Sequence, residues 1–201
     1  MKIVVNLAHD DGAMVRLLNY LVREDEDLLR KHPAVPLLYS RPGGRPLVRY
    51  KQEKIETWSD IWMTLRQEWE DCDALSAWRA AELRARGWRA IEPGYSSFAA
   101  AQALRPAFIE AQVFLRTLNH KVYHCLVRYR LEGAPRTAQD PWYYDDPSAR
   151  LGMYGGRFED ARTVELRLLE QLKERDRLLT LSPEWGRIVR PAHFGSIERS
   201  F

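Results

Sequence analysis

The chain has 201 residues, 45% of them hydrophobic and 29% charged, which is the composition of an ordinary globular domain. Its 31 basic and 28 acidic residues leave a formal charge of +3, too small to argue for nucleic-acid binding. Only two cysteines are present, which argues against a secreted disulfide scaffold. No apolar run is long enough for a membrane span or a secretory signal. We therefore expect a soluble protein that stays in the cytoplasm where it is made.

The first third of the chain is expected to be mainly helical. Residues 2–7 suit a short strand, and an amphipathic helix follows Asp11 and ends before Pro33. Residues 34–52 are rich in turn-forming residues. A second helix is expected from a cap at Ser59 to about Gln67.

A strong amphipathic helix is predicted from Cys72 to Gly87, which stops it as a glycine at the C-terminal cap does. We expect residues 88–92 to begin an extended segment, while residues 94–107 suit either a short helix or a loop. The pattern indicates Trp78, Ala81 and Leu83 as core positions of the Cys72 helix.

Two strands, 111–118 and 122–130, are expected to form an antiparallel hairpin, and a loop follows at 132–141. Helices first and antiparallel strands later predict an α+β fold. The domain is expected to cover residues 1–157. Residues 158–201 are then a C-terminal addition: a long charged helix to about Leu179 and an extended arm.

Cys72 is the first candidate for chemistry. A helix N-terminus favours the thiolate over the thiol, because its unpaired N–H groups carry a partial positive charge. A cysteine nucleophile also needs a base to take its proton and a third group to hold that base. The chain downstream should therefore supply a histidine and a carboxylate.

His124 lies in the middle of the second predicted strand and is the candidate base. Alternation along a strand puts His124 and Cys125 on opposite faces. If His124 faces Cys72, Cys125 should face away and be a buried, inert hydrophobe. His120 lies four residues before His124 on a hairpin rather than a helix, which argues against a metal pair.

Asp146 is the candidate orienting group. It precedes Pro147, which favours an extended conformation for the residue before it. At the end of a strand beside the His124 strand, its carboxylate would reach the imidazole Nδ1–H. Asp145 is the local rival, and both acids are also typical of a turn.

These residues carry a resemblance. Asp-Cys-Asp with Leu-Ser-Ala-Trp-Arg-Ala-Ala-Glu-Leu, then Tyr-His-Cys-Leu-Val, then Asp-Pro-Ser-Ala-Arg-Leu-Gly-Met, resembles transglutaminase-like proteins encoded by tailed bacteriophages and prophages. The resemblance covers roughly residues 12–155. It implies a papain-like core, with the catalytic helix packed on a small antiparallel sheet, and it implies Cys72 as nucleophile, His124 as base and Asp146 as orienting acid.

The sequence departs from the family at Glu70, where we expect glycine. With Asp71 and Asp73 it places three acids around Cys72, and nearby negative charge raises a thiol pKa. Asp71 is alternatively a helix cap. The Cys72 N–H is the expected first oxyanion donor, and Gln67 and Trp69 are weaker candidates for the second.

We expect cysteine-dependent acyl transfer on a peptide or protein amide, with hydrolysis favoured over cross-linking, and with neither cofactor nor metal. The alternative is a non-catalytic phage assembly or virion protein with a vestigial triad, whose partners would be other phage proteins. The sequence contains no groove-reading motif, which argues against a nucleic-acid-binding module.

Overall fold

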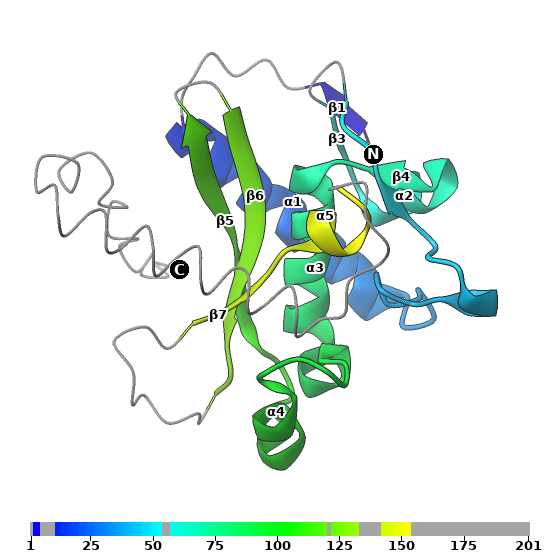
Figure 1. The fold of residues 1–201 in the computed structure, drawn as a ribbon, viewed down its shortest axis with the longest axis vertical. Helices are drawn as coiled ribbons and strands as arrows, with labels where there is room; N and C mark the ends of the chain where they lie inside the picture. Colours follow the sequence, from blue (N-terminus) through cyan, green and yellow to red (C-terminus); the bar gives the residue numbers. More distant parts are fainter. Residues whose placement is uncertain (1, 5–10, 54–56, 120–121, 133–141, 154–201) are drawn as a thin grey trace, which may run out of the picture.

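The structure is a computed structural model that describes residues 2–4, 11–53, 57–119, 122–132 and 142–153. His120, the predicted 132–141 loop beyond residue 132, the predicted helix from Phe158 and the C-terminal arm lie outside these residues. The fold is α+β, as the sequence predicted, with helices and small sheets (Figure 1). None of the described helices is long and apolar enough to cross a membrane.

All of the described helices except α5 precede the main sheet along the chain. The described helices are α1 (Asp11–Lys31), α2 (Ile61–Gln67), α3 (Cys72–Arg86), α4 (Phe98–Leu104) and α5 (Pro147–Arg150), with 3-10 turns η1 (Pro42–Gly44) and η2 (Gly87–Ala90). The described strands are β1 (Lys2–Val4), β2 (Arg49–Tyr50), β3 (Thr57–Ser59), β4 (Trp69–Glu70), β5 (Glu110–Asn119), β6 (Val122–Arg130) and β7 (Tyr143–Asp145).

The main sheet has the order β5-β6-β7 and is antiparallel throughout. The predicted hairpin is confirmed as β5 and β6, paired from Glu110↔Arg130 to Asn119↔Val122. The strand β7 is short and pairs with the second half of β6, from Val127↔Asp145 to Tyr129↔Tyr143. Two small pairs complete the sheets: β1 with β3, antiparallel, and β2 with β4, parallel.

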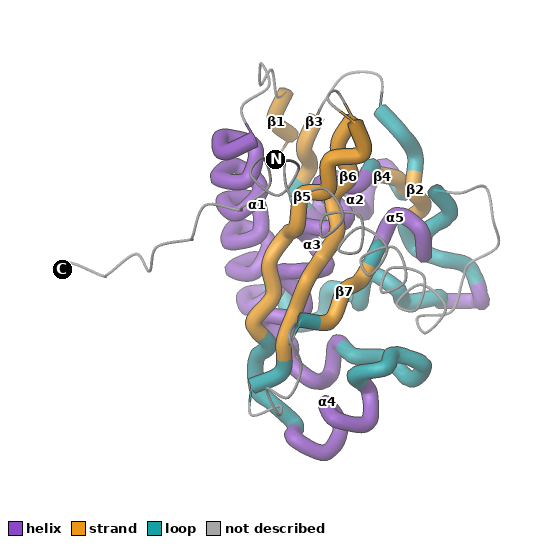
Figure 2. The backbone as a smooth tube through the Cα atoms, turned by 60° about the vertical axis from the view of Figure 1, so that its left-hand side comes forward, coloured by secondary structure: helices purple, strands orange, loops and turns teal. Residues whose placement is uncertain are grey.

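The helix α3 is the centre of the fold. It packs against α1 and against β5 and β6, and α1 also contacts β5, so the two long helices and the main sheet enclose the core (Figure 2). Every residue of α3 from Asp73 to Leu83 is buried, which explains why this helix carries so many alanines. The expected core residues Trp78, Ala81 and Leu83 are all fully buried.

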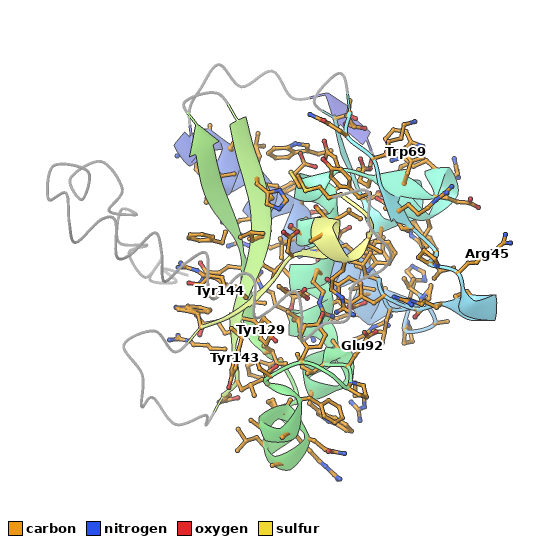
Figure 3. All side chains as sticks on the ribbon, viewed as in Figure 1. Arg45, Trp69, Glu92, Tyr129, Tyr143 and Tyr144 are labelled. Carbon is orange, nitrogen blue, oxygen red and sulfur yellow. The ribbon has the colours of Figure 1, made fainter. Side chains whose placement is uncertain are left out.

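The residues of β6 divide between two cores, as strand alternation requires. Cys125, Val127 and Tyr129 belong to the main core with α3. Leu126 belongs to a second, small cluster with Tyr144 and Ala149. Tyr129 and Tyr143 stack with ring centres 5.5 Å apart across the β6–β7 pair, where Figure 3 labels both.

Two local predictions were wrong. Asp60, not Ser59, caps α2: its side chain accepts from the Met63 N–H at 2.9 Å, while Ser59 ends β3. Residues 87–90 form the turn η2 rather than an extended segment, because the Ile91 N–H bonds back to the Trp88 carbonyl.

Gly87 ends α3 as predicted, with a φ of 57°. A Cβ there would lie 2.3 Å from the carbonyl oxygens of Pro106 and Ala107, so only glycine fits this crossing. The ambiguous segment 94–107 contains the short helix α4, which ends at the left-handed Arg105, just before Pro106.

Candidate active site

Cys72 is the first residue of α3 and is half-buried. The chain reaches it through a sharp turn, since Glu68 takes a left-handed conformation with a φ of 62° after α2, and the two-residue strand β4 follows. Asp71 occupies the N-cap position, but its side chain makes no capping hydrogen bond. The thiol therefore lies at the N-terminus of the central helix, where the helix dipole favours an anion.

His124 and Asp146 meet at the end of the β6–β7 pair. Asp146 directly follows β7, so the antiparallel register carries it along β6 toward His124. Asp146 Oδ2 lies 2.9 Å from His124 Nε2, and both side chains are almost fully buried. The sequence predicted a contact with Nδ1, and the carboxylate reaches Nε2 instead.

Asp146 is fixed in orientation by a second contact. Its Oδ1 accepts from the Ala149 N–H at 3.0 Å, so the same carboxylate caps α5. Pro147 is the first residue of α5, where a missing N–H costs nothing. The Asp-Pro sequence therefore sets the direction of one carboxylate oxygen toward the helix and of the other toward the imidazole.

The Cys72 thiol lies beside the His124 ring and interacts with it directly. Since Asp146 takes Nε2, the ring nitrogen left for the thiol is Nδ1, which is buried and makes no hydrogen bond of ordinary geometry with any described residue. The structure thus brings Cys72, His124 and Asp146 together, from helix, strand and the turn after a strand.

Both titrating groups are shifted toward their charged forms. The neighbouring Cys125 thiol and then His124 outweigh the opposing effect of burial and lower the pKa of Cys72 to about 5. Burial would lower the pKa of His124, but the Asp146 hydrogen bond and the Cys72 sulfur raise it to about 9. Between these two values a thiolate faces an imidazolium.

Cys125 is buried, as predicted, but it does not face away from Cys72. Its thiol interacts with the Cys72 sulfur, and the pKa of Cys125 is raised well above its usual value by this contact and by burial. Ser76, one turn along α3 from Cys72, donates to the Cys125 carbonyl at 3.0 Å. Both cysteines are free thiols.

The prediction failed because it assumed that α3 lies over one face of the strand. The Cys72 thiol instead interacts with the side chains of both neighbours on β6, His124 and Cys125.

The three acids around Cys72 are all buried rather than solvated. Burial raises the pKa of Glu70 to about 7, against the opposing effect of the neighbouring Ser59 hydroxyl. Glu70 Oε2 accepts from Gln67 Nε2 at 2.6 Å, and the Trp69 ring lies 4.3 Å from the Lys51 ammonium. Neither of these two contacts involves Cys72, and the second oxyanion donor stays a prediction.

A group of buried, charged side chains near the triad was not predicted from the sequence. We call it the buried ion cluster: Arg79, Glu82, Asp145 and Arg150. Asp145, the rival carboxylate, belongs to this cluster and accepts from Arg79 Nε at 2.7 Å. A signal was present in the sequence, because Arg79 lies four residues before Leu83 and Glu82 lies four residues after Trp78, a spacing that puts them on the same helix face as these core residues.

No group of three or more His, Cys, Asp or Glu side chains that would hold a metal ion occurs among the described residues. Comparison with models of protein families, with curated proteins and with solved structures finds no match for this chain.

Proposed function

We propose that the chain is a cysteine-dependent acyl-transfer enzyme on a papain-like, transglutaminase-like core, as the motif resemblance implies. The observation that carries the proposal is the arrangement of the three side chains. A thiol at a helix N-terminus lies beside an imidazole whose far nitrogen is held by a buried carboxylate at 2.9 Å. A nucleophile, a base and a group that orients the base are the parts that such chemistry needs.

The reaction begins with attack of the Cys72 thiolate on an amide carbonyl carbon. The C–S bond forms, the C–N bond breaks, and the imidazolium of His124 gives its proton to the leaving amine. Water then attacks the thioester while His124 takes its proton. The C–S bond breaks, and a carboxylic acid and the thiolate are released. An amine in place of water would give a cross-link instead.

Asp146 keeps His124 in position for both steps and stabilises the imidazolium. We infer hydrolysis of a peptide or protein amide as the activity, because water is always available as the acceptor. By the same resemblance we propose that the protein acts in a host cell's cytoplasm or in a virion, on protein substrates.

The test is the pH dependence of Cys72 alkylation by iodoacetamide, followed by mass spectrometry of the peptide that contains it. We expect half-maximal reactivity near the pKa of about 5, and little label on Cys125 at neutral pH. His124→Gln should move the Cys72 midpoint upward. A wild-type midpoint near the ordinary thiol pKa of about 8.5 would overturn the proposal and favour the non-catalytic phage protein.

Turnover is tested next with a panel of peptide amides, each incubated with wild type and with Cys72→Ala. An acylated Cys72 peptide seen only in the wild type identifies the acyl group that the enzyme accepts.

A further inference from the structure

The buried ion cluster joins the two elements that carry the triad. Arg79 Nε donates to Asp145 Oδ2 at 2.7 Å, and the two side chains are 1% and 0% exposed. Arg79 lies on α3 about two helical turns after Cys72, which places it on the same side of the helix. Asp145 is the residue directly before Asp146.

Two links therefore run in parallel between α3 and the end of β7. One passes from Cys72 through His124 to Asp146, and the other is the Arg79–Asp145 ion pair. Because α3 fixes the spacing of Cys72 and Arg79, and one peptide unit fixes that of Asp145 and Asp146, the second link limits how far the first can open.

Asp145 is held from three directions. The Tyr39 hydroxyl donates to both of its oxygens at 3.0 Å, and the Tyr95 hydroxyl donates to Oδ2 at 2.9 Å. These donors come from segments before α2 and after η2, so several parts of the chain converge on one carboxylate. Burial raises the pKa of Asp145, while Arg79 and the Tyr39 hydrogen bond oppose that rise.

Arg79 is fixed just as firmly. Its Nη1 donates to Glu82 Oε2 at 2.6 Å and to the Ala90 carbonyl at 2.9 Å. Burial alone would lower the pKa of Arg79. Asp145, Tyr39 and Glu82 outweigh this effect and raise the pKa above its ordinary value, so the guanidinium stays charged. Its planar shape then fixes the direction of the bond to Asp145.

Arg150 closes the far side of the cluster. It lies 3.7 Å from the centre of the Tyr39 ring, and its Nη2 donates at 3.1 Å to Glu92, which Figure 3 labels. It also contacts the Tyr95 hydroxyl. Since Arg150 is the last residue of α5, the cluster holds the chain both before Asp146, at Asp145, and after it, at Arg150.

We propose that Arg79 and Asp145 are positioning residues, whose ion pair keeps Asp146 within hydrogen-bonding distance of His124 and so keeps His124 directed at Cys72. The inference rests on the proposed function and adds to it. An apolar pair of similar volume would stabilise the core as well or better, so stability alone does not account for buried charges here. A directional ion pair prevents the sliding that apolar contacts allow.

The test compares two Arg→Lys substitutions on α3. Arg79→Lys keeps a charge but loses the fork that reaches Asp145 and Glu82 together. Arg84→Lys is the matched control, because Arg84 Nε also ties α3 to the sheet, donating to the Ala111 carbonyl at 2.7 Å, but on β5. Each variant is assayed for the pH dependence of Cys72 alkylation and for cooperative thermal unfolding.

In Arg79→Lys the Cys72 midpoint should rise by about one pH unit or more, which lowers the alkylation rate at pH 4 about tenfold. In Arg84→Lys the midpoint should stay at the wild-type value. Combining Arg79→Lys with Asp145→Glu restores the length of the pair and should bring the midpoint back.

An Arg79→Lys profile that overlays the wild type in a folded protein overturns the inference. Should Arg79→Lys fail to unfold cooperatively, Tyr95→Phe takes its place: it removes one donor to Asp145 and keeps the ring. Its midpoint should rise by a smaller amount, and an unchanged midpoint would equally overturn the inference. A wild-type midpoint of about 8.5 would overturn the proposed function as well, whereas a low wild-type midpoint with unchanged variants overturns the inference alone.

Discussion

Asp145 and Asp146 are neighbours in sequence and belong to two different polar regions. Asp145 is fully buried, and it accepts hydrogen bonds from the side chains of Tyr39, Arg79 and Tyr95, which come from three other segments of the chain. Asp146 binds one imidazole and one backbone N–H, and beyond that imidazole lies a thiol. Burial is nearly the same for both. The difference lies in the partner. Asp145 pairs with the Arg79 guanidinium, which stays charged, whereas Asp146 pairs with the His124 imidazole, which titrates.

Asp146→Asn should therefore give the largest loss of activity. An amide can still accept at one oxygen, but it cannot stabilise an imidazolium, and loss of the orienting acid costs about 10⁴ in rate in the serine-protease template. The thiolate should reduce this cost, because a thiol ionises more readily than a hydroxyl. Turnover and the Cys72 alkylation midpoint measure it, with thermal unfolding as the control for folding.

Asp145→Asn should instead act first on stability. It leaves the Arg79 guanidinium buried with Glu82 as its remaining acidic partner, and breaking one side of a buried pair costs about 3–5 kcal/mol. Urea unfolding measures the loss. Should Asp146→Asn destabilise the protein more than Asp145→Asn, the division between the two regions is wrong.

The buried carboxyl of Glu70 should make the stability of the fold depend on pH. Its pKa is raised to about 7 when folded, against 4.5 as the ordinary value, so the folded protein binds more protons between these values. Stability should therefore fall as pH rises from 4.5 to 7, by at most about 3 kcal/mol for this group. Glu70→Gln should flatten this part of the curve of melting temperature against pH. The same slope in wild type and variant would assign it to another group.

The activity itself should follow a bell between the two shifted values. Below about pH 5 the Cys72 thiolate takes up a proton and the nucleophile is lost. Above about pH 9 His124 loses the proton that the leaving amine needs. The rate should fall about tenfold for each pH unit beyond either value. A rate that continues to rise through pH 9 would show that the imidazolium is not the acid.

The sequence predicted the parts of this site that are local. A cysteine at a helix start, a histidine in a strand and an Asp-Pro after one are each visible in a few residues, and the structure brings them together. Their catalytic roles remain a proposal. The order of helices and strands likewise predicted the α+β fold.

What the sequence did not predict depends on tertiary packing. The contact between Cys72 and Cys125 depends on how α3 packs against β6, which alternation along β6 does not reveal. The partners of Arg79 come from segments far apart in the chain. The cap at Asp60 was missed because Ser59, an equally good cap by residue type, is used as the end of a strand.

The two hydrogen bonds of Asp146 make a backbone amide into a reporter on the triad. The Ala149 N–H and the His124 ring do not compete, since each bonds to its own oxygen of Asp146. Both hydrogen bonds nevertheless depend on the orientation of the same carboxylate. Opening of the Pro147–Arg150 turn frees the Asp146 carboxylate to rotate away from the imidazole, and this can occur while the core stays folded. Protection of the Ala149 amide against hydrogen exchange would measure how much of the time the carboxylate keeps the orientation that holds the imidazole, with no substrate present.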